Sequence, residues 1–275
     1  MTDIVAGVGV PHTPFFPEIV QREGPQCETA QLFRAVAEHL EAVKPDILVI
    51  FDSDHLNTFF LNNLPLFCVG AADRAEGPND ETPAMPRYVV PVAESFAHHV
   101  RAVGIRDGFD LALSQEFELD HSVLVPLHFL TPRMQIPIVP VFIGGIVPPL
   151  PLTRRCFALG QAVRRAIEAW RGPERVAVLA SGSFSLEVTG PNAPDNQISG
   201  APDPGWADTV VRCLNRGATN ELLEQATTER ILAAGNVAGE LLNWIALLGV
   251  LGDRRPRFLE PQLQMGHAYG VWRWD

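Results

Sequence analysis

The chain has 275 residues, of which 47% are hydrophobic and 19% charged, so it can form a sizeable core and global disorder is excluded. The net charge of -11, with no basic cluster beyond arginine pairs, argues against nucleic acid as a partner. No apolar run reaches the length needed to span a membrane.

The first part of the chain alternates apolar runs with helical patterns. Residues 4–10 form a predicted strand that Pro11 ends, and residues 29–43 have apolar side chains at helical spacing. The β-branched run 47–51 is typical of a buried parallel strand. Residues 57–92 are rich in proline and glycine, so we expect irregular excursions over the face that carries the site.

The remaining chain continues this alternation. The predicted elements are helices at 92–103, 152–170, 207–214, 221–224 and 239–251, strands at 111–113, 138–143 and 176–180, and a loop at 189–205. The alternation predicts one α/β domain over residues 1–275, with a mostly parallel central sheet flanked by helices. In such sheets, ligands bind at the carboxyl ends of the strands.

Cysteine usage and the N-terminal residues indicate a cytoplasmic protein. The four cysteines are far apart and form no CxxC pair, so we expect reduced, mostly buried thiols and no zinc site. The first residues lack a basic region followed by an apolar stretch, so we expect no signal peptide.

Three residues are candidate metal ligands. His12 in V-P-H-T-P and His55 in F-D-S-D-H each follow a predicted strand, while Glu240 lies in an apolar predicted helix. A carboxylate there is costly unless it is paired or bound to a metal. Two imidazoles and one carboxylate are the ligands of non-haem Fe(II) oxygenases. The alternative is that His12 and His55 are loop residues that bond to the backbone, and the apolar surroundings of Glu240 favour the metal site.

The order of these motifs resembles the class III extradiol ring-cleavage dioxygenases, the group that includes the β subunit of protocatechuate 4,5-dioxygenase. The resemblance covers nearly the whole chain. It places His12 and His55 at the two metal-binding histidines of the family, and Glu240, in G-E-L-L-N-W, at its metal-binding glutamate. The D-H pair that contains His121, followed by V-P-L, resembles the segment with a further active-site histidine. The segment R-C-F-A-L-G at Arg155 is similar to a family helix start.

One departure from the family pattern concerns its acid/base histidine. The family pattern G-[TS]-G-G-[LM]-S-H corresponds here to A-S-G-S-F-S-L, so Leu186 stands at the position of that histidine. Leucine cannot transfer a proton, and a positioned base contributes about 10²–10⁴-fold to the rate. We expect His121 to be the substitute, ahead of Glu187. His267 is a further candidate, although we expect it to be an exposed histidine of the C-terminal tail.

The resemblance implies an extradiol dioxygenase whose Fe(II) is held by His12, His55 and Glu240, and whose partners are a small aromatic substrate and O2. The missing base favours an acidic substrate, such as an aminophenol-like or hydroxypyridone-like ring, over plain catechol. Arg87 or Arg133 could hold a substrate carboxylate. The family suggests a homo-oligomer, and a small companion subunit is left open.

Two other functions stay open on the sequence alone. A chain without the base could be a non-catalytic homologous subunit of a dioxygenase complex. Such a partner would be expected to lose metal ligands as well, whereas this chain keeps all three. A hydrolytic Zn²⁺ site with the same ligands is the other alternative, and no feature of the sequence supports it.

Overall fold

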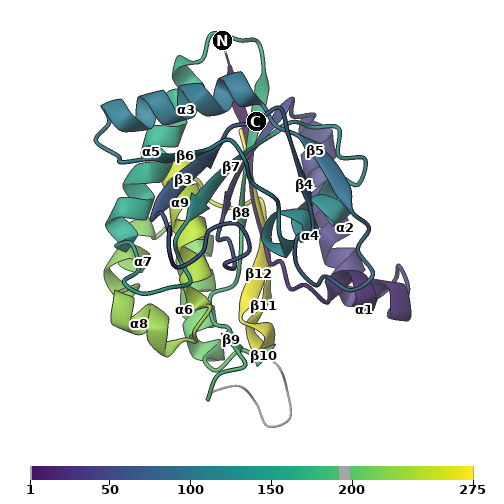
Figure 1. The fold of residues 1–275 in the computed structure, drawn as a ribbon. Helices are drawn as coiled ribbons and strands as arrows, with labels where there is room; N and C mark the ends of the chain where they lie inside the picture. Colours follow the sequence, from purple (N-terminus) through teal and green to yellow (C-terminus); the bar gives the residue numbers. More distant parts are fainter. Residues whose placement is uncertain (1, 192–198, 275) are drawn as a thin grey trace.

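The protein is built around an eight-stranded sheet, which the computed structural model of residues 2–191 and 199–274 places between two layers of helices (Figure 1). In spatial order the strands are β11 (Phe258–Gln262), β12 (His267–Arg273), β1 (Asp3–Val10), β8 (Arg175–Ser181), β2 (Ile47–Asp52), β7 (Ile138–Ile143), β3 (Phe67–Gly70) and β6 (Ala112–Ser114). Strands β1, β8, β2 and β7 run parallel, as do β3 and β6, while β11, β12 and the β3–β7 pair are antiparallel. The predicted α/β fold with a mostly parallel central sheet is confirmed.

Helices cover both faces of the sheet, which explains why the central strands are continuous apolar runs. Every residue of β2 and of β7 is buried. Helices α3 (Glu94–Arg106), α5 (Thr153–Ala169) and α9 (Leu241–Leu251) pack on one face. Helices α2 (Glu28–Val43) and α4 (His121–Leu130) pack on the other.

Helix α9 is a central helix with no solvent-facing side, since all of its residues are buried. It packs very closely against α5. A Cβ atom at Gly160 of α5 would lie 1.8 Å from the carbonyl oxygen of Ala246 in α9, so only glycine allows this contact. The position of α9 along the sheet is therefore fixed by backbone contact.

The smaller elements lie around this core. They are helices α1 (Phe16–Glu23), α6 (Pro204–Arg216), α7 (Thr219–Gln225) and α8 (Thr228–Ala233), the 3₁₀ turns η1 (Ala238–Glu240) and η2 (Leu263–Met265), and the pairs β4 (Arg74–Gly77) with β5 (Tyr88–Pro91) and β9 (Glu187–Val188) with β10 (Ser199–Gly200). Within the described ranges, no helix has the length and apolar character that a membrane span requires.

The structure differs from the sequence-based expectations where segments are short or pair over long distances. The region 57–92 contains β3, β4 and β5 and is not wholly irregular. Of the predicted loop 189–205, residues 192–198 lie outside the described part, while β10 and the first residues of α6 fall within it. The predicted helix 239–251 begins two residues later, which places Glu240 in η1.

Candidate metal centre

The three candidate ligands lie together at the carboxyl edge of the sheet. His12 follows β1 and His55 follows β2, and because these strands point the same way, both imidazoles reach one edge. His12 Nε2 lies 2.8 Å and His55 Nε2 3.1 Å from the same oxygen, Glu240 Oε1. The two rings are 5.2 Å apart. The expected convergence is thus observed, whereas the role of these residues as ligands stays a prediction.

Glu240 is fully buried and is held by the turn that follows β8. The backbone N–H of Ser183 donates to Glu240 Oε2 at 2.7 Å. Gly182 has a φ of +146°, and a Cβ atom there would lie 2.5 Å from Glu240 Cβ, so this close approach requires glycine. Asn243 and Trp244, one turn into α9, donate to backbone carbonyls of the same turn at 2.7 and 3.0 Å. The carboxylate therefore has one oxygen fixed and the other directed at the imidazoles.

The hydrogen bonds of Ser181 fix the tautomer of His12. The Ser181 hydroxyl donates its single proton to the carbonyl oxygen of Ser122, at 2.6 Å. It can therefore only accept from His12 Nδ1, which lies 2.7 Å away. A neutral His12 then carries its proton on Nδ1 and presents the lone pair of Nε2 to Glu240.

Asp120 has the same effect on His55. Its Oδ2 accepts from the backbone N–H of His55 at 2.9 Å and from the ring Nδ1 at 3.0 Å. A carboxylate only accepts, so the ring proton lies on Nδ1 and the lone pair of Nε2 points toward Glu240. Two lone pairs and an anionic oxygen thus face one another in a buried space. Such an arrangement is stable only with a cation, which can be a proton or a metal ion.

Burial and charge compete at each of these groups. Burial disfavours the charged form of Glu240, but the attraction and hydrogen bonds of His12 and His55 outweigh it and lower its pKa. Burial lowers the pKa of His12, and Glu240 offsets this in part. For His55, bonds to Asp120 and Glu240 overcome burial and raise the pKa well above its ordinary value. Burial opposes the charge of Asp120 too, yet His55 holds its pKa well below the usual range. Both carboxylates are therefore anionic at neutral pH.

His121 brings a third imidazole to the cluster. It is the first residue of α4, and its ring stacks on His55 at 4.3 Å and meets His12 edge-on at 5.4 Å. One ring nitrogen of each of the three histidines lies within 4.8 Å of the others. His121 Nδ1 forms a short hydrogen bond to Asp80 Oδ2. Sequence reasoning missed Asp80, because a lone aspartate in the loop between β4 and β5 carries no distinguishing signal.

His267 is buried, and the expectation of an exposed tail histidine is wrong. It is 3% exposed and begins β12, which pairs with β1 so that Gly270 faces Gly9. Continued by three residues, this antiparallel register brings His267 beside His12. Burial lowers the pKa of His267 to about 3, and Glu240 offsets this only in part. The C-terminal residues form a β-hairpin, and its pairing with β1 is a long-range contact that the local sequence does not reveal.

Leu186 and Glu187 contact the segment before η1. The carbonyl of half-buried Leu186 accepts from the backbone N–H of Val237 at 3.0 Å. Glu187 is buried, and its Oε2 accepts from the backbone N–H of Asn236 at 2.7 Å. Glu187 thus stabilises a loop, which supports the expectation that it ranks below His121. The phenyl group of Phe184 lies in the core against Trp244, so it does not enter the cluster either.

The two arginines suggested for a substrate carboxylate have other positions. Arg87 is exposed and pairs with Glu118 at 2.9 Å and with Glu76 at 3.5 Å. Arg133 lines a pocket with Lys44, where α2 and α4 end ahead of β2 and β7, so it lies at the opposite edge of the sheet. That suggestion is wrong for Arg133, and Arg87 is committed to its two glutamates.

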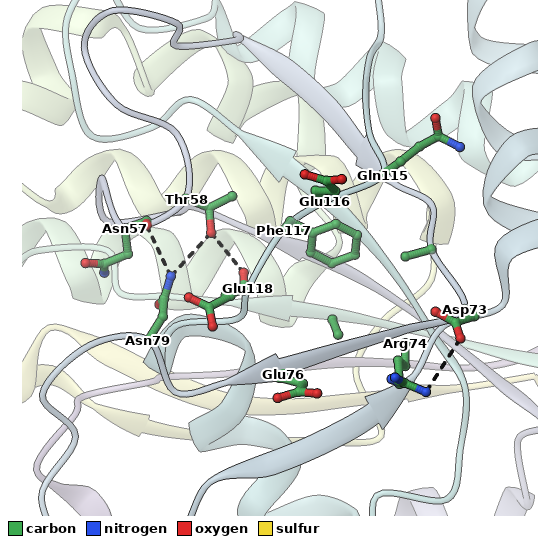
Figure 2. A pocket seen from close by; sticks show the side chains of 12 residues that line it. Asn57, Thr58, Asp73, Arg74, Glu76, Asn79, Gln115, Glu116, Phe117 and Glu118 are labelled. Carbon is green, nitrogen blue, oxygen red and sulfur yellow. Dashed lines mark hydrogen bonds and ion pairs between the residues drawn. The ribbon is translucent and has the colours of Figure 1, made fainter.

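A pocket of about 500 Å³ lies beside the cluster, between β4, the segment after His55 and residues 115–118 (Figure 2). In Figure 2 the Asn79 side chain bridges this wall, donating to the Asn57 carbonyl at 3.1 Å and to Thr58 Oγ1 at 3.4 Å. The amide of Asn57 also donates to Asp120 Oδ2, at 3.4 Å. The wall of this pocket therefore supports the residue that orients His55.

Comparisons with known proteins identify the family of this chain. Residues 6–271 match the family model described as the catalytic LigB subunit of aromatic ring-opening dioxygenase. A 2,3-dihydroxyphenylpropionate/2,3-dihydroxicinnamic acid 1,2-dioxygenase of Burkholderia vietnamiensis is 28% identical over 89% of this chain and 87% of the relative. A Mycobacterium protein of the same name is 30% identical over 82% of this chain and 84% of its own length. The crystal structure of an uncharacterized Escherichia coli K12 protein superposes with a TM-score of 0.61 at 14% identity, covering 97% of this chain and 99% of that one, and shows the fold alone.

Proposed function

This chain belongs to the LigB family of catalytic subunits of aromatic ring-opening dioxygenases, and we propose that it is an Fe(II)-dependent extradiol enzyme with His12, His55 and Glu240 as its metal ligands. The observation that carries the proposal is the arrangement of lone pairs. Both Nε2 atoms face Glu240 Oε1, at 2.8 and 3.1 Å, and both Nδ1 atoms are occupied by acceptors. Metal-binding histidines characteristically donate their second ring N–H in this way.

The donor set fits a divalent transition metal. Two imidazole nitrogens and one carboxylate oxygen leave open coordination positions, as non-haem Fe(II) oxygenases require. When bound, ferrous iron would supply the electron transfer that couples oxidation of the ring to reduction of O2. The chain itself supplies the orientation: Ser181 and Asp120 hold the two rings, and the Ser183 N–H holds Glu240.

We propose a ring with two vicinal hydroxyl groups as the substrate. The relatives are named for dihydroxyphenyl compounds, and their names are the reason to place such catechols first. A hydroxypyridone or an aminophenol remains the alternative that the missing base suggests, because an acidic substrate depends less on a protein base. The two classes differ in the ionisation that limits the rate, so the pH profile distinguishes them.

His121 is the proposed proton-transfer residue. Its Nδ1 is bound to Asp80, which leaves Nε2 as the acceptor, and its ring stacks on His55. An imidazole oriented by a carboxylate in this way is a common general base. His267 is the second candidate, because it is a buried imidazole beside the strand end that carries His12.

The test is anaerobic purification with iron quantification, followed by O2 uptake with a panel of catechols, aminophenols and hydroxypyridones. We expect one iron per chain and iron-dependent uptake with at least one catechol. Glu240→Ala is the control, and it should hold no iron. Stoichiometric iron without uptake on any substrate would favour the non-catalytic subunit. Activity with Zn²⁺ in place of iron would refute the proposal. Gel filtration of the same sample tests the expected homo-oligomer.

A further inference from the structure

Asp52 is a buried carboxyl group that has no part in the proposed metal site. It is the last residue of β2 and is 0% exposed. Its Oδ2 lies 3.2 Å from Ser122 Oγ, and its Oδ1 is buried without a hydrogen-bond partner among the residues described. A carboxylate with one contact in such a place would be strongly disfavoured. Some feature of the surroundings must therefore prevent Asp52 from carrying a buried, unpaired charge.

The answer follows from the single proton of the Ser122 hydroxyl. Ser122 Oγ lies between two carboxyl groups, at 3.2 Å from Asp52 Oδ2 and at a shorter distance from Asp120 Oδ1. Asp120 already accepts from the backbone N–H groups of Ser122 and His55, both at 2.9 Å, and from the His55 ring, so it is the acceptor. Ser122 donates to Asp120 and has no second proton for Asp52. The contact with Asp52 is favourable only when Asp52 carries the proton and donates to Ser122 Oγ.

The groups around Asp52 agree with this assignment. Burial raises its pKa well above the ordinary value, and repulsion from Asp120 and Asp54 adds to the shift, while Ser122 and His55 oppose it. On the neighbouring strand β7, the apolar residue Phe142 lies opposite Asp52. No ion pair of Asp52 with lysine or arginine occurs within residues 2–191 and 199–274.

We propose that Asp52 is a positioning residue for His55. As a neutral acid it donates to Ser122, the Ser122 hydroxyl donates to Asp120, and Asp120 accepts the Nδ1 proton of His55. Donors from both sides therefore converge on Asp120, which remains an acceptor for the Nδ1 proton, so the lone pair of His55 Nε2 stays directed at Glu240. The inference rests on the proposed function, in which His55 is a metal ligand.

The test compares Asp52→Asn with Asp52→Ala. The side-chain amide that Asp52→Asn introduces can donate to Ser122 in place of the acid, so we expect near wild-type iron affinity. Asp52→Ala frees the Ser122 hydroxyl, and we expect a loss of about 10-fold, the lower end of the effect of groups that orient metal-binding histidines. Thermal unfolding of both proteins shows whether Asp52→Ala is folded. Equal losses of affinity in the two variants would overturn the proposal.

Two measurements on metal-free protein test the protonation of Asp52 and the tautomer of His55 independently of iron. Infrared difference spectra of wild type against Asp52→Asn should show the loss of a protonated carboxyl band at neutral pH. Nitrogen NMR of His55, recorded at a pH above its raised pKa, should show the Nδ1–H tautomer in wild type and Asp52→Asn, and a mixture in Asp52→Ala. A spectrum with carboxylate bands alone would overturn the proposal even if iron binds. Failure of wild type to bind iron, with both spectra as expected, would instead overturn the proposed function.

Discussion

Two helices begin at the candidate metal centre, each with an acidic residue at its N-cap position, and the two acids have different roles. At the start of α4, Asp120 accepts from the Ser122 backbone N–H as a helix cap and also orients His55. At the start of α9, Glu240 makes no capping bond and faces two imidazoles. The α4 side is a network of donors and acceptors that holds rings in place. On the α9 side, Glu240 presents Oε1 to the cation, a proton or a metal ion, that the imidazoles of His12 and His55 also face.

The difference teaches that the partners of an acid, and not its place in a helix, determine its function. Asp120 has all its neighbours in donor roles, so it needs no metal. Glu240 Oε2 has a donor in Ser183, but its Oε1 faces Nε2 atoms that bear lone pairs. Changes on the α9 side should therefore remove the metal, and changes on the α4 side should weaken or misdirect it.

Removal of the α9 acid should have the largest effect. Glu240→Ala should abolish iron binding, which metal analysis after anaerobic reconstitution measures. The metal-free variant should also be less stable by roughly 1–3 kcal/mol, because the buried Ser183 N–H loses its acceptor. Glu240→Gln, of the same size but neutral, is the matched control for volume. Full iron occupancy in Glu240→Ala would exclude this residue as a ligand.

Removal of the third imidazole on the α4 side should affect turnover more than binding. We expect His121→Phe to lower kcat by about 10²-fold or more, since it removes a positioned base, with a much smaller change in KM. Steady-state O2 uptake measures both constants. His267→Phe is the comparison: if it, and not His121→Phe, causes the large loss, the proton-transfer residue lies on the β12 side.

An amide in place of the α4 acid should misdirect a ligand. Asn caps helices about as well as Asp, so the cap of α4 should persist in Asp120→Asn. Its NH2 group, however, would face His55 and favour the wrong tautomer, so iron affinity should fall by about 10–100-fold. Asp203→Asn, which alters the remote cap of α6, should leave iron affinity unchanged. An equal effect of both variants would mean that Asp120 acts only as a cap.

A residue of this centre could be predicted from the sequence when the pattern that reveals it is local, and could not when its role depends on a residue far along the chain. His12 and His55 were predictable because each follows an apolar strand, and Glu240 because a carboxylate among apolar residues demands a partner. Asp80 and Ser122 were not, since each acquires its role from a residue far along the chain.

The elements of the fold differ in predictability for the same reason. The central strands and α5 have a clear local pattern of apolar residues. Helix α4 was missed because Pro126 interrupts its pattern, and the β11–β12 hairpin was missed because its pairing with β1 is not a local property.

Acid should destabilise the metal-free protein through His267. The folded-state pKa is lowered from 6.5 to about 3, so the unfolded chain binds the proton first as the pH falls. Stability is therefore lost between about pH 6.5 and pH 3, by up to about 1.4 kcal/mol per pH unit for this one group. Denaturant unfolding of wild type and His267→Phe across this range measures the difference. Parallel pH profiles would show that His267 is not buried as a neutral ring.

The smallest effect should come from restoring an imidazole at Leu186. Leu186→His should gain activity on ordinary catechols and add a limb to the pH–rate profile near the titration of histidine, about 6.5 when unperturbed. Leu186→Asn, polar but without a titratable group, is the control. No change in catechol activity or in pH profile would show that residue 186 does not face the substrate.

The contact of Gly160 with the backbone of α9 bears on attempts to make this enzyme more heat-resistant. Replacing a glycine inside a helix by alanine is a routine way to raise the melting temperature, with a gain of up to roughly 1 kcal/mol. Here the added methyl group would meet the Ala246 carbonyl at 1.8 Å and push α9 away. Glu240 stands at the end of that helix, so a substitution chosen for robustness would displace the carboxylate from the histidines. Protein engineers should therefore leave this glycine in place.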